Sequence, residues 1–358
     1  METLCFFNTA KAWGGGEKWH FEISKYLHQK GHKVFVIAHS QSVLYQKLLK
    51  AGIPCEGIKL TNLSFLSPFK HLKIQGLLKK NNVRAIIMNL SRDVKIAGPS
   101  AKKVNASRII YRRGSAIPIK NNFLNRFLFK KVVTDVLANS IATKKTVLEN
   151  NSNLFPEEKI KIIYNGIDIV DTSNMSQPKA EEIFTLVNIG RLEYQKNQKF
   201  LVHLAAELKK RDFQFKIIIG GEGRLRDTLE GLIKELGVEE YVILPGFVND
   251  PLPFIMQGDV FVLPSFWEGF GYVLAEAALC KKPIVAFDIS SNPELVLHEQ
   301  SGYLVQEGNL AEFADRIVEL NENSEKRIQM GLNGFQNLQK NFDKKEQLKK
   351  IEDYLIHG

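Results

Sequence analysis

FTLVNIGRLEYQKNQKFLVHLAAELKKRDFQFKIIIGG, residues 184–221, places an amphipathic stretch between two short apolar runs. The runs at 184–190 and 215–221 are rich in β-branched residues and predict buried strands. Residues 197–211 between them repeat apolar positions at helical spacing. A continuous apolar strand, a helix and a second such strand are typical of a parallel sheet that is covered by helices.

The same alternation runs along the rest of the chain. Toward the C-terminus we expect strands at 241–247, 260–264, 283–288 and 302–305, and helices at 224–236, 271–280, 310–321 and 324–340. Toward the N-terminus we expect strands at 3–8, 33–39, 84–90, 107–113 and 135–140, and helices at 17–30, 43–51, 69–81, 94–104 and 142–150. Two such series predict an α/β protein with two doubly wound, Rossmann-like domains, each binding ligands at the carboxyl ends of its strands.

A linker is expected where the two series meet. Residues 164–182, YNGIDIVDTSNMSQPKAEE, are rich in Gly, Asp, Ser, Asn and Pro. We expect a first domain at 1–168, a second domain at 169–340 and a C-terminal helix at 341–358 that packs back on the first domain. A length of 358 residues suits two cores of this size.

The composition, with 44% hydrophobic and 25% charged residues, is that of a soluble globular protein. No apolar stretch approaches the ~20 residues of a membrane span. The first residues lack a basic region followed by an apolar core, so no signal peptide is expected. The three cysteines are far apart and without metal-ligand spacing, which favours a reducing cytosol and no metal site.

The charge is distributed unevenly. Residues 1–168 contain 28 Lys and Arg against 10 Asp and Glu, a net charge of +18, and the remainder has a net charge of −8. Such asymmetry suggests nucleic acid, an anionic membrane surface or an acidic substrate, although a solvated lysine-rich surface would also explain it. Residues 115–131, SAIPIKNNFLNRFLFKK, could lie in a bilayer interface or pack on their own domain as an amphipathic helix.

Two glycine-rich loops follow expected strands. Gly14, Gly15 and Gly16 precede the helix at 17–30, where backbone N–H groups could receive an anion or a sugar, or simply form a flexible turn. The loop is neither a P-loop nor a dinucleotide fingerprint. Gly190 ends another strand, and Arg191 and Lys196 after it could clamp a diphosphate or lie on the surface.

FWEGFGYVLAEA, residues 266–277, places Glu268 and Glu276 on either side of two glycines at a strand–helix junction. A carboxylate pair suggests a glycosidase. The helix dipole and the nearby Arg191 and Lys196 would keep both acids ionised, however, which disfavours a general acid. Acceptors for ligand hydroxyl groups suit them better.

Five motifs, taken together and in their order along the chain, resemble those of a retaining glycosyltransferase of family 4. Enzymes of this family have the two-domain GT-B fold, and the resemblance is to the bacterial cell-envelope or lipopolysaccharide type. The five motifs are WGGGEKW at 13–19, NGID at 165–168, GRLEYQKN at 190–197, GGEG at 220–223, and the pair Glu268 and Glu276. Together they span nearly the whole chain. The resemblance implies a nucleotide-sugar held in a cleft between two domains, with no metal and no other cofactor.

The resemblance also implies roles for individual residues. Arg191 and Lys196 would bind the diphosphate and stabilise the departing nucleotide, and Glu268 would face the donor sugar. The remaining donor-binding residues would be Gly15, Gly16, Gly190, Gly221, Phe270, Gly271 and Glu276, with Glu276 on the ribose hydroxyls. Cations and a helix N-terminus fixed near the leaving diphosphate would lower the barrier.

One position departs from the family pattern. Many relatives carry a histidine after the fourth strand, whereas this chain has IIYRRGSA, with Arg112 and Arg113. The neighbouring NLSRDVKIAG offers Asp93. Asp93 and Arg113 could face the acceptor or the donor sugar, and Asp93 could equally cap the helix that follows it.

The sequence therefore predicts an enzyme that moves a hexose-type sugar from a nucleotide-sugar, UDP favoured over GDP, to a hydroxyl of a lipid-linked or cell-surface glycan with retention. We expect it in the cytoplasm, peripheral on the inner face of the membrane. Alternatives are a nucleotide-sugar epimerase on the same fold and a non-catalytic partner that binds nucleotide or membrane. A nucleic-acid partner is not expected, because stacking aromatics and a recognised binding motif are missing.

Overall fold

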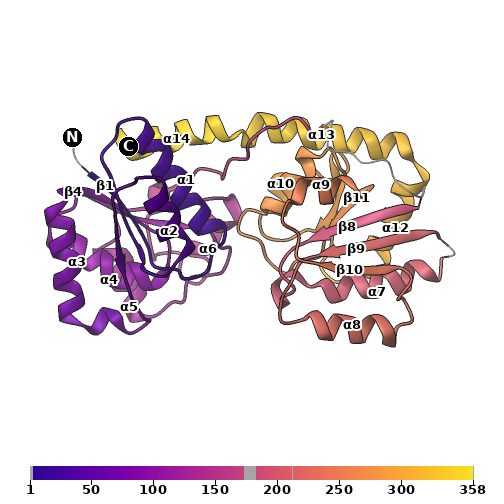
Figure 1. Ribbon diagram of the computed structural model, residues 1–358, viewed down its shortest axis with the longest axis horizontal. Helices are drawn as coiled ribbons and strands as arrows, with labels where there is room; N and C mark the ends of the chain where they lie inside the picture. Colours follow the sequence, from indigo (N-terminus) through magenta and orange to yellow (C-terminus); the bar gives the residue numbers. More distant parts are fainter. Residues whose placement is uncertain (1–2, 173–182, 212, 358) are drawn as a thin grey trace. The chain divides into compact units, whose positions relative to one another are not determined.

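The computed structural model describes residues 3–172, 183–211 and 213–357, and the chain divides into two compact units. One unit comprises Met1–Gly166 together with Lys345–Gly358, and the other comprises Ile167–Lys344. The sequence-based boundaries lie after residues 168 and 340, and residues 173–182 of the expected linker lie outside the described residues. Figure 1 shows each unit as a sheet with helices on both faces.

The first unit is built on a seven-stranded parallel sheet with the strand order β3-β2-β1-β4-β5-β6-β7. Its strands are β1 (Thr3–Asn8), β2 (Val34–His39), β3 (Cys55–Ile58), β4 (Val83–Met88), β5 (Arg108–Arg113), β6 (Asp135–Ala138) and β7 (Ile160–Ile162). Its helices are α1 (Gly15–Gln29), α2 (Val43–Lys50), α3 (Pro68–Lys80), α4 (Ser91–Lys103), α5 (Phe123–Lys131), α6 (Ile141–Leu148) and α14 (Lys344–Ile356, in this unit from Lys345), with 3-10 turns η1 (Ser64–Leu66) and η2 (Glu157–Lys159).

The second unit is built on a six-stranded parallel sheet with the order β10-β9-β8-β11-β12-β13. Its strands are β8 (Phe184–Ile189), β9 (Phe215–Gly220), β10 (Val242–Gly246), β11 (Val260–Leu263), β12 (Ile284–Phe287) and β13 (Gly302–Val305). Its helices are α7 (Gln198–Lys209), α8 (Arg226–Glu235), α9 (Pro251–Met256), α10 (Tyr272–Leu279), α11 (Asn292–Leu295), α12 (Leu310–Glu322) and α13 (Ser324–Phe342), with a 3-10 turn η4 (Tyr194–Lys196).

The expected class, two doubly wound α/β domains, is confirmed. The elements that sequence patterning missed are short. Strands β3 and β7 have four and three residues and alternate too briefly to stand out from loops. Helix α9 has six residues and begins at Pro251. Among the described residues, no helix is both long and apolar enough to cross a bilayer.

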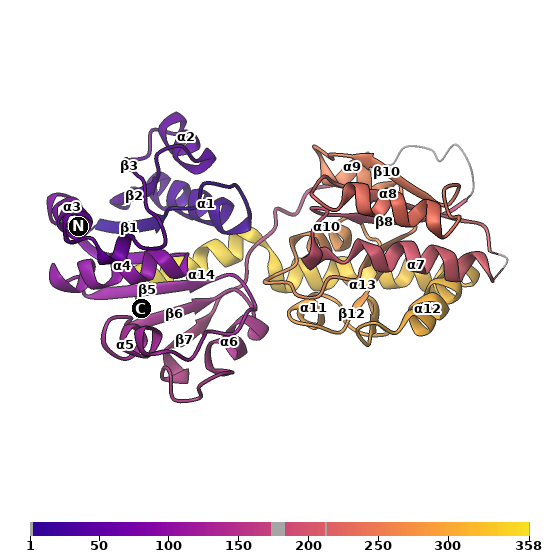
Figure 2. The same ribbon diagram turned by 90° about the horizontal axis from the view of Figure 1, so that it is seen from below.

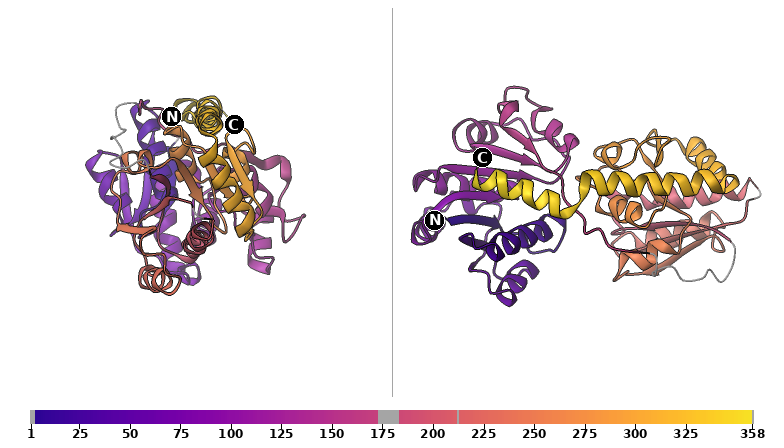
Figure 3. Two further views of the ribbon diagram at one scale, coloured as in Figure 1. Left: turned by 90° about the vertical axis from the view of Figure 1, so that its right-hand side faces the viewer. Right: turned by 90° about the horizontal axis from the view of Figure 1, so that it is seen from above.

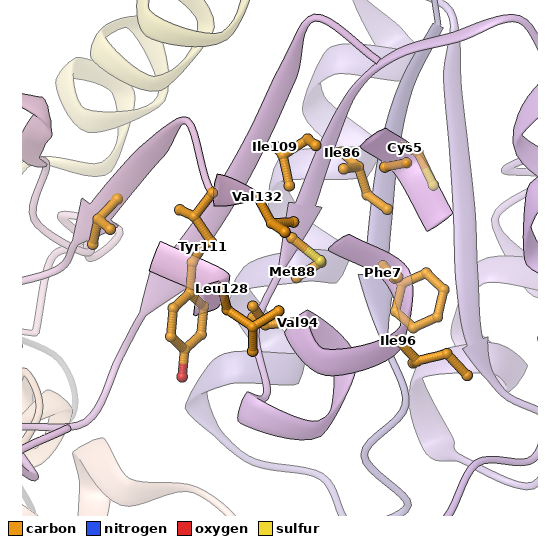
Figure 4. Close-up of a cluster of buried hydrophobic side chains, with 14 of the residues drawn as sticks. Cys5, Phe7, Ile86, Met88, Val94, Ile96, Ile109, Tyr111, Leu128 and Val132 are labelled. Carbon is orange, nitrogen blue, oxygen red and sulfur yellow. The ribbon is translucent and has the colours of Figure 1, made fainter. Parts of the chain in front are cut away.

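The two faces of the first sheet pack against different helices. Because successive side chains of a strand point to opposite faces, β1 contributes to two cores. Cys5 and Phe7 pack with residues of α3, α4 and α5, whereas Leu4 and Phe6 pack with residues of α1, α2 and α14. Figure 4 shows part of the first of these cores, with Met88, Val94 and Leu128 between sheet and helices.

The last helix, α14, completes the first unit although it follows the second unit in the chain. Ile351 and Leu355 are buried in the core that α1 and α2 form with the sheet, and Figure 3 shows α14 in yellow across this face of the sheet. The Tyr26 hydroxyl donates to Glu352 Oε2 at 2.7 Å, and Arg108 donates to the Tyr354 carbonyl at 2.6 Å. The helix is therefore part of the hydrophobic core of this unit.

We expect Leu355→Ala to lower the free energy of unfolding by about 2–4 kcal/mol, because a large side chain leaves a cavity in a packed core. The matched control is Ile356→Ala, since Ile356 in the same helix is 37% exposed and Leu355 only 4%. Urea unfolding of both variants measures the difference. Equal midpoints for the two variants would contradict the packing of α14 on the first unit.

Candidate active site

Lys196 and Glu268 form a largely buried ion pair in the second unit. Lys196 Nζ donates to Glu268 Oε1 at 2.7 Å, and their side chains are 13% and 8% exposed. Lys196 ends η4 after strand β8, and Glu268 lies in the loop after strand β11. Because β8 and β11 are paired parallel neighbours, the loops that follow them meet at the same sheet edge.

Three further hydrogen bonds, one between backbones and two from side chains to backbone, hold the two loops together. Phe266 N donates to the Gln195 carbonyl, Gln195 Nε2 donates to the Trp267 carbonyl, and Asn197 Nδ2 donates to the Pro264 carbonyl. Asn197 itself adopts the left-handed conformation, with φ at 51°, between η4 and α7. Gln195 and Asn197 both fall within GRLEYQKN, but no sequence pattern indicated a role for either. These contacts fix the position of the Lys196 ammonium group.

Arg191 is exposed at the same loop. Its carbonyl accepts hydrogen bonds from Gln198 Nε2 and from the Glu193 amide, so its backbone is anchored. Among the residues that the structure describes, its guanidinium makes no hydrogen bond or ion pair. An anchored backbone and an open guanidinium suit the binding of an anion.

Gly221 lets three strand ends approach closely, and Gly190 lies against the Lys196 side chain, which a Cβ on Gly190 would meet at 3.4 Å. The Gly190 amide donates to the Gly220 carbonyl at 3.0 Å, and the Gly221 amide donates to the Gly246 carbonyl at 2.7 Å. Gly221 has φ at +141°, and a Cβ added to it would lie 1.9 Å from the Gly190 carbonyl oxygen. No other residue fits at Gly221 without movement of the backbone.

The stretch 266–277 places its residues in three different settings. Gly271, with φ at +81°, precedes helix α10, and Glu276 is half-buried within that helix. The Phe270 side chain is buried against the rings of Tyr272 and Phe342, which leaves only its backbone for a ligand. Glu268 lies in the loop with Lys196. The structure thus places the two acids in different environments, as their positions in the sequence suggested.

The glycine loop of the first unit begins helix α1 at Gly15 and lies over the end of β4. A Cβ on Gly16 would lie 2.4 Å from Asn89 Nδ2. The side chain of Glu17 is buried and accepts from Asn8 Nδ2 at 3.0 Å. Gly15 is exposed at the start of the helix.

Arg112 is the centre of a buried polar cluster in the first unit. It donates to Asn89 Oδ1 at 3.1 Å and to Asn165 Oδ1 at 3.0 Å, and its guanidinium lies 4.9 Å from the centre of the Trp19 ring. His20 is fully buried nearby, and burial, followed by the Arg112 charge, lowers the pKa of its imidazole. The sequence pattern indicated Arg112 but not Asn89 or His20. Asn89 follows a strand end, which is the signal that could have identified it.

Asp93 and Arg113 both hold loops of the first unit. The Asp93 carboxylate is fully buried and accepts hydrogen bonds from the amide and the hydroxyl of Thr9, which follows β1. It lies in the first turn of α4, where it also interacts with the backbone of Leu90, the N-cap residue. Arg113 donates to the carbonyls of Ser115 and Ile117 and so fixes the loop after β5.

Within residues 3–172, 183–211 and 213–357, no group of three His, Cys, Asp or Glu side chains is placed to hold a metal ion. The candidate site contains the cations Arg191 and Lys196, the Glu268 carboxylate and backbone amides, in loops that follow parallel strands.

Comparison with known proteins gives two family matches. Residues 13–171 match the model described as Glycosyltransferase Family 4, and residues 171–337 match the model described as Glycosyl transferases group 1. The chain is 30% identical over 329 residues to N-acetylgalactosamine-N,N'-diacetylbacillosaminyl-diphospho-undecaprenol 4-alpha-N-acetylgalactosaminyltransferase of Campylobacter jejuni, covering 86% of this chain and 87% of that protein. It is 29% identical over 188 residues to a poly(ribitol-phosphate) alpha-N-acetylglucosaminyltransferase of Staphylococcus aureus, covering 52% and 37%.

Among solved structures, HepE of Anabaena in complex with UDP superposes with a TM-score of 0.84 at 23% identity, over 99% of both chains. The lipopolysaccharide outer core galactosyltransferase WaaB superposes with a TM-score of 0.81 at 18% identity, also over 99% of both chains. At these identities the likeness concerns the fold, which is the expected GT-B fold.

We expect Gly221→Ala to lower the free energy of unfolding by about 2–4 kcal/mol, because the added Cβ overlaps the Gly190 carbonyl and the backbone conformation disfavours a side chain. The control is Gly231→Ala on the exposed side of α8, where an added Cβ meets nothing within 4 Å. That change should raise stability by about 0.5–1 kcal/mol. Urea unfolding distinguishes them, and a stable Gly221→Ala protein would contradict the close approach.

Asp93 should give the free energy of unfolding a defined dependence on pH. Burial raises the pKa of Asp93 to about 7 from its ordinary 3.8, although hydrogen bonds from Thr9 oppose the rise. The folded state therefore favours the protonated carboxyl, whose contribution to stability is full below 3.8 and is lost as the pH rises through about 7. We expect the wild type to lose stability relative to Asp93→Asn over this range. If the free energy of unfolding depended on pH in the same way in both proteins, Asp93 would not be the group responsible for the loss of stability.

Proposed function

The chain belongs to the family 4 glycosyltransferases of the GT-B fold, of the cell-envelope type, and on that premise we propose the reaction that it catalyses. The enzyme transfers a hexose-type sugar from UDP-sugar to a hydroxyl of a lipid-linked or cell-surface glycan, with retention at the anomeric carbon. The bond between the anomeric carbon and the diphosphate oxygen breaks. A bond to the acceptor oxygen forms, and the acceptor hydroxyl loses its proton.

The observation that carries this proposal is the fixed Lys196 ammonium group beside the exposed Arg191. Negative charge accumulates on the diphosphate as it departs. A cation that is already in place stabilises this charge without rearranging in the transition state. Lys196 is held by Glu268 and by the bonded loops, and Arg191 adds a guanidinium that can bind two phosphate oxygens at once.

Glu268 has two roles in this proposal. One oxygen, Oε1, accepts the Lys196 hydrogen bond. The carboxylate has a second oxygen, which we assign to a hydroxyl of the donor sugar. Glu276 on α10 binds the ribose hydroxyls, and the backbone amides of Phe270 and Gly271 contact the sugar or the phosphate. Gly221 contributes by keeping the strand ends close enough to form the donor site, and Gly190 by leaving room beside the Lys196 side chain.

Asp93 and Arg113 act indirectly in this proposal. Asp93 holds the loop after β1 through Thr9, and Arg113 holds the loop after β5 through Ser115 and Ile117. Asp93 and Arg113 would influence acceptor binding by positioning these loops.

The donor and acceptor classes are supported by what the relatives are named for. The HepE structures contain UDP and UDP-glucose, which favours UDP over GDP. The Campylobacter relative is named for a diphospho-undecaprenol substrate and the Staphylococcus relative for poly(ribitol-phosphate). Both names support an acceptor of the cell envelope, and we propose that the enzyme works peripherally on the inner face of the cytoplasmic membrane.

We expect Lys196→Ala to lower turnover with the UDP-sugar by several orders of magnitude while the fold survives, because the departing diphosphate loses a fixed cation. The matched control is Lys199→Ala, which removes an equal charge from an exposed position three residues away. Radiolabelled sugar transfer and circular dichroism measure the two effects. Near-normal turnover of Lys196→Ala would refute the role of Lys196. Thermal stabilisation by UDP-sugars compared with GDP-sugars identifies the donor base.

A further inference from the structure

Helices α3, α4 and α5 form one layer on the first sheet. Ile74 of α3, Val94 of α4 and Leu128 of α5 are buried in the same core, so all three helices turn their other sides away from the sheet. Figure 2 looks onto these helices. We call the outward side of this layer the α3–α5 surface. It also includes η1, the residues just before η1 and the residues just before α5.

The α3–α5 surface has exposed cations and no exposed acid. Between Glu56 and Asp135 the chain contains 17 Lys and Arg residues and a single acid, Asp93. Asp93 is fully buried. The exposed cations on or beside the three helices are Lys73, Lys79, Lys80, Lys102, Lys103, Lys120, Arg126, Lys130 and Lys131. Three exposed acids border this surface on the α5 side. Glu149 adjoins Asn150, which is hydrogen-bonded to Ile119 and Asn121 just before α5. Glu157 and Glu158 lie in η2, and Glu157 lines a hollow together with Lys130 of α5.

Helix stabilisation alone does not explain this pattern. Each of the three helices has two lysines in its last turn, where cations interact favourably with the helix dipole. The dipole favours acids in the first turn by the same physics. The first turns of α3 and α5 contain no acid. The excess of positive charge therefore points to an anionic partner.

Large apolar side chains are exposed among these cations. In α3, Phe69 and Leu72 are 81% and 63% exposed, and Lys73 and Lys80 follow on the same face. Leu63, just before η1, and Leu66, at the end of η1, are 69% and 68% exposed. Monomeric proteins rarely expose rows of this kind unless the row is an interaction site.

Helix α5 repeats the arrangement of α3. Phe123 and Phe127 are 78% and 46% exposed, and they share a face with Arg126 and Lys130. The other face of α5 contributes Leu128 and Phe129 to the core. The segment 115–131 thus packs on its own domain and also presents an apolar and basic stripe. The sequence left these two roles open as alternatives.

We propose that the α3–α5 surface docks the protein on an anionic lipid bilayer. Leu66, Phe69, Leu72 and Phe123 enter the acyl boundary, and the surrounding lysines and Arg126 contact the headgroups. A nucleic acid or another soluble polyanion would use the cations but would leave Phe69 and Phe123 in water. The inference rests on the proposed function in one respect, because it names the surface that brings the enzyme to a lipid-linked acceptor.

Flotation with vesicles tests this surface with the intact protein. We expect binding to vesicles of phosphatidylglycerol and phosphatidylethanolamine at moderate salt, and little binding to phosphatidylcholine vesicles. Phe69→Ser/Phe123→Ser should lower the partition coefficient about tenfold or more, because two apolar anchors are lost. The matched control is Phe247→Ser in the second unit, where the side chain is 77% exposed.

A second pair of variants tests the charges. Lys73→Gln/Lys80→Gln should also lower binding about tenfold or more, because each lysine contributes to attraction by anionic lipid. Lys234→Gln removes an exposed lysine from the last turn of α8 and should leave binding unchanged.

Two outcomes would overturn the inference. The first is that the wild type does not float with anionic vesicles. The second is that the lysine variants lose binding, the phenylalanine variants keep it, and DNA competes with the vesicles, which would indicate a surface for soluble polyanions. Hydrolysis of UDP-sugar in the absence of membrane separates this test from that of the proposed function. Phe69→Ser/Phe123→Ser should retain it fully, whereas Lys196→Ala should lose it.

Discussion

The parallel direction of all the strand pairings is the constraint on which the rest of the structure depends. Parallel neighbours cannot be joined by tight turns, so a helix must cross between them, and the loops that leave the strands gather at one edge of each sheet. This gathering brings Lys196 within 2.7 Å of Glu268, 72 residues farther along the chain. In the first unit it brings Asn89 and Asn165 to Arg112.

The Lys196–Glu268 pair shows the effect of bringing two loops together at one sheet edge. A buried ion pair adds little net stability, because the loss of hydration offsets the attraction between the charges. What the pair does provide is a single position for an ammonium group, which the hydrogen bonds of Gln195 and Asn197 to the neighbouring loop reinforce. The same residues thus add little to stability and hold the ammonium group precisely in place. This combination is usual where charge must be stabilised during a reaction.

Most of the fold could be predicted from the sequence, because long apolar runs and amphipathic helices are repeated patterns. The edge strands β3 and β7 could not, since three or four residues carry too little periodicity. For the candidate site, the motifs predicted where Arg191, Lys196 and Glu268 lie, but not that Glu268 binds Lys196. The burial of Asp93 and the cluster of Arg112 with Asn89 depend on contacts between distant segments, which no local pattern contains.

The position of α14 has a consequence for biosynthesis. The core between α1, α2 and the sheet includes Ile351 and Leu355, which follow the whole of the second unit in the chain. The second unit, Ile167–Lys344, is synthesised in full before them. Domains that are continuous in sequence can fold in the order of their synthesis. Here the first unit is completed only after the second, so its apolar face beside α1 and α2 stays uncovered while residues 167–344 are synthesised.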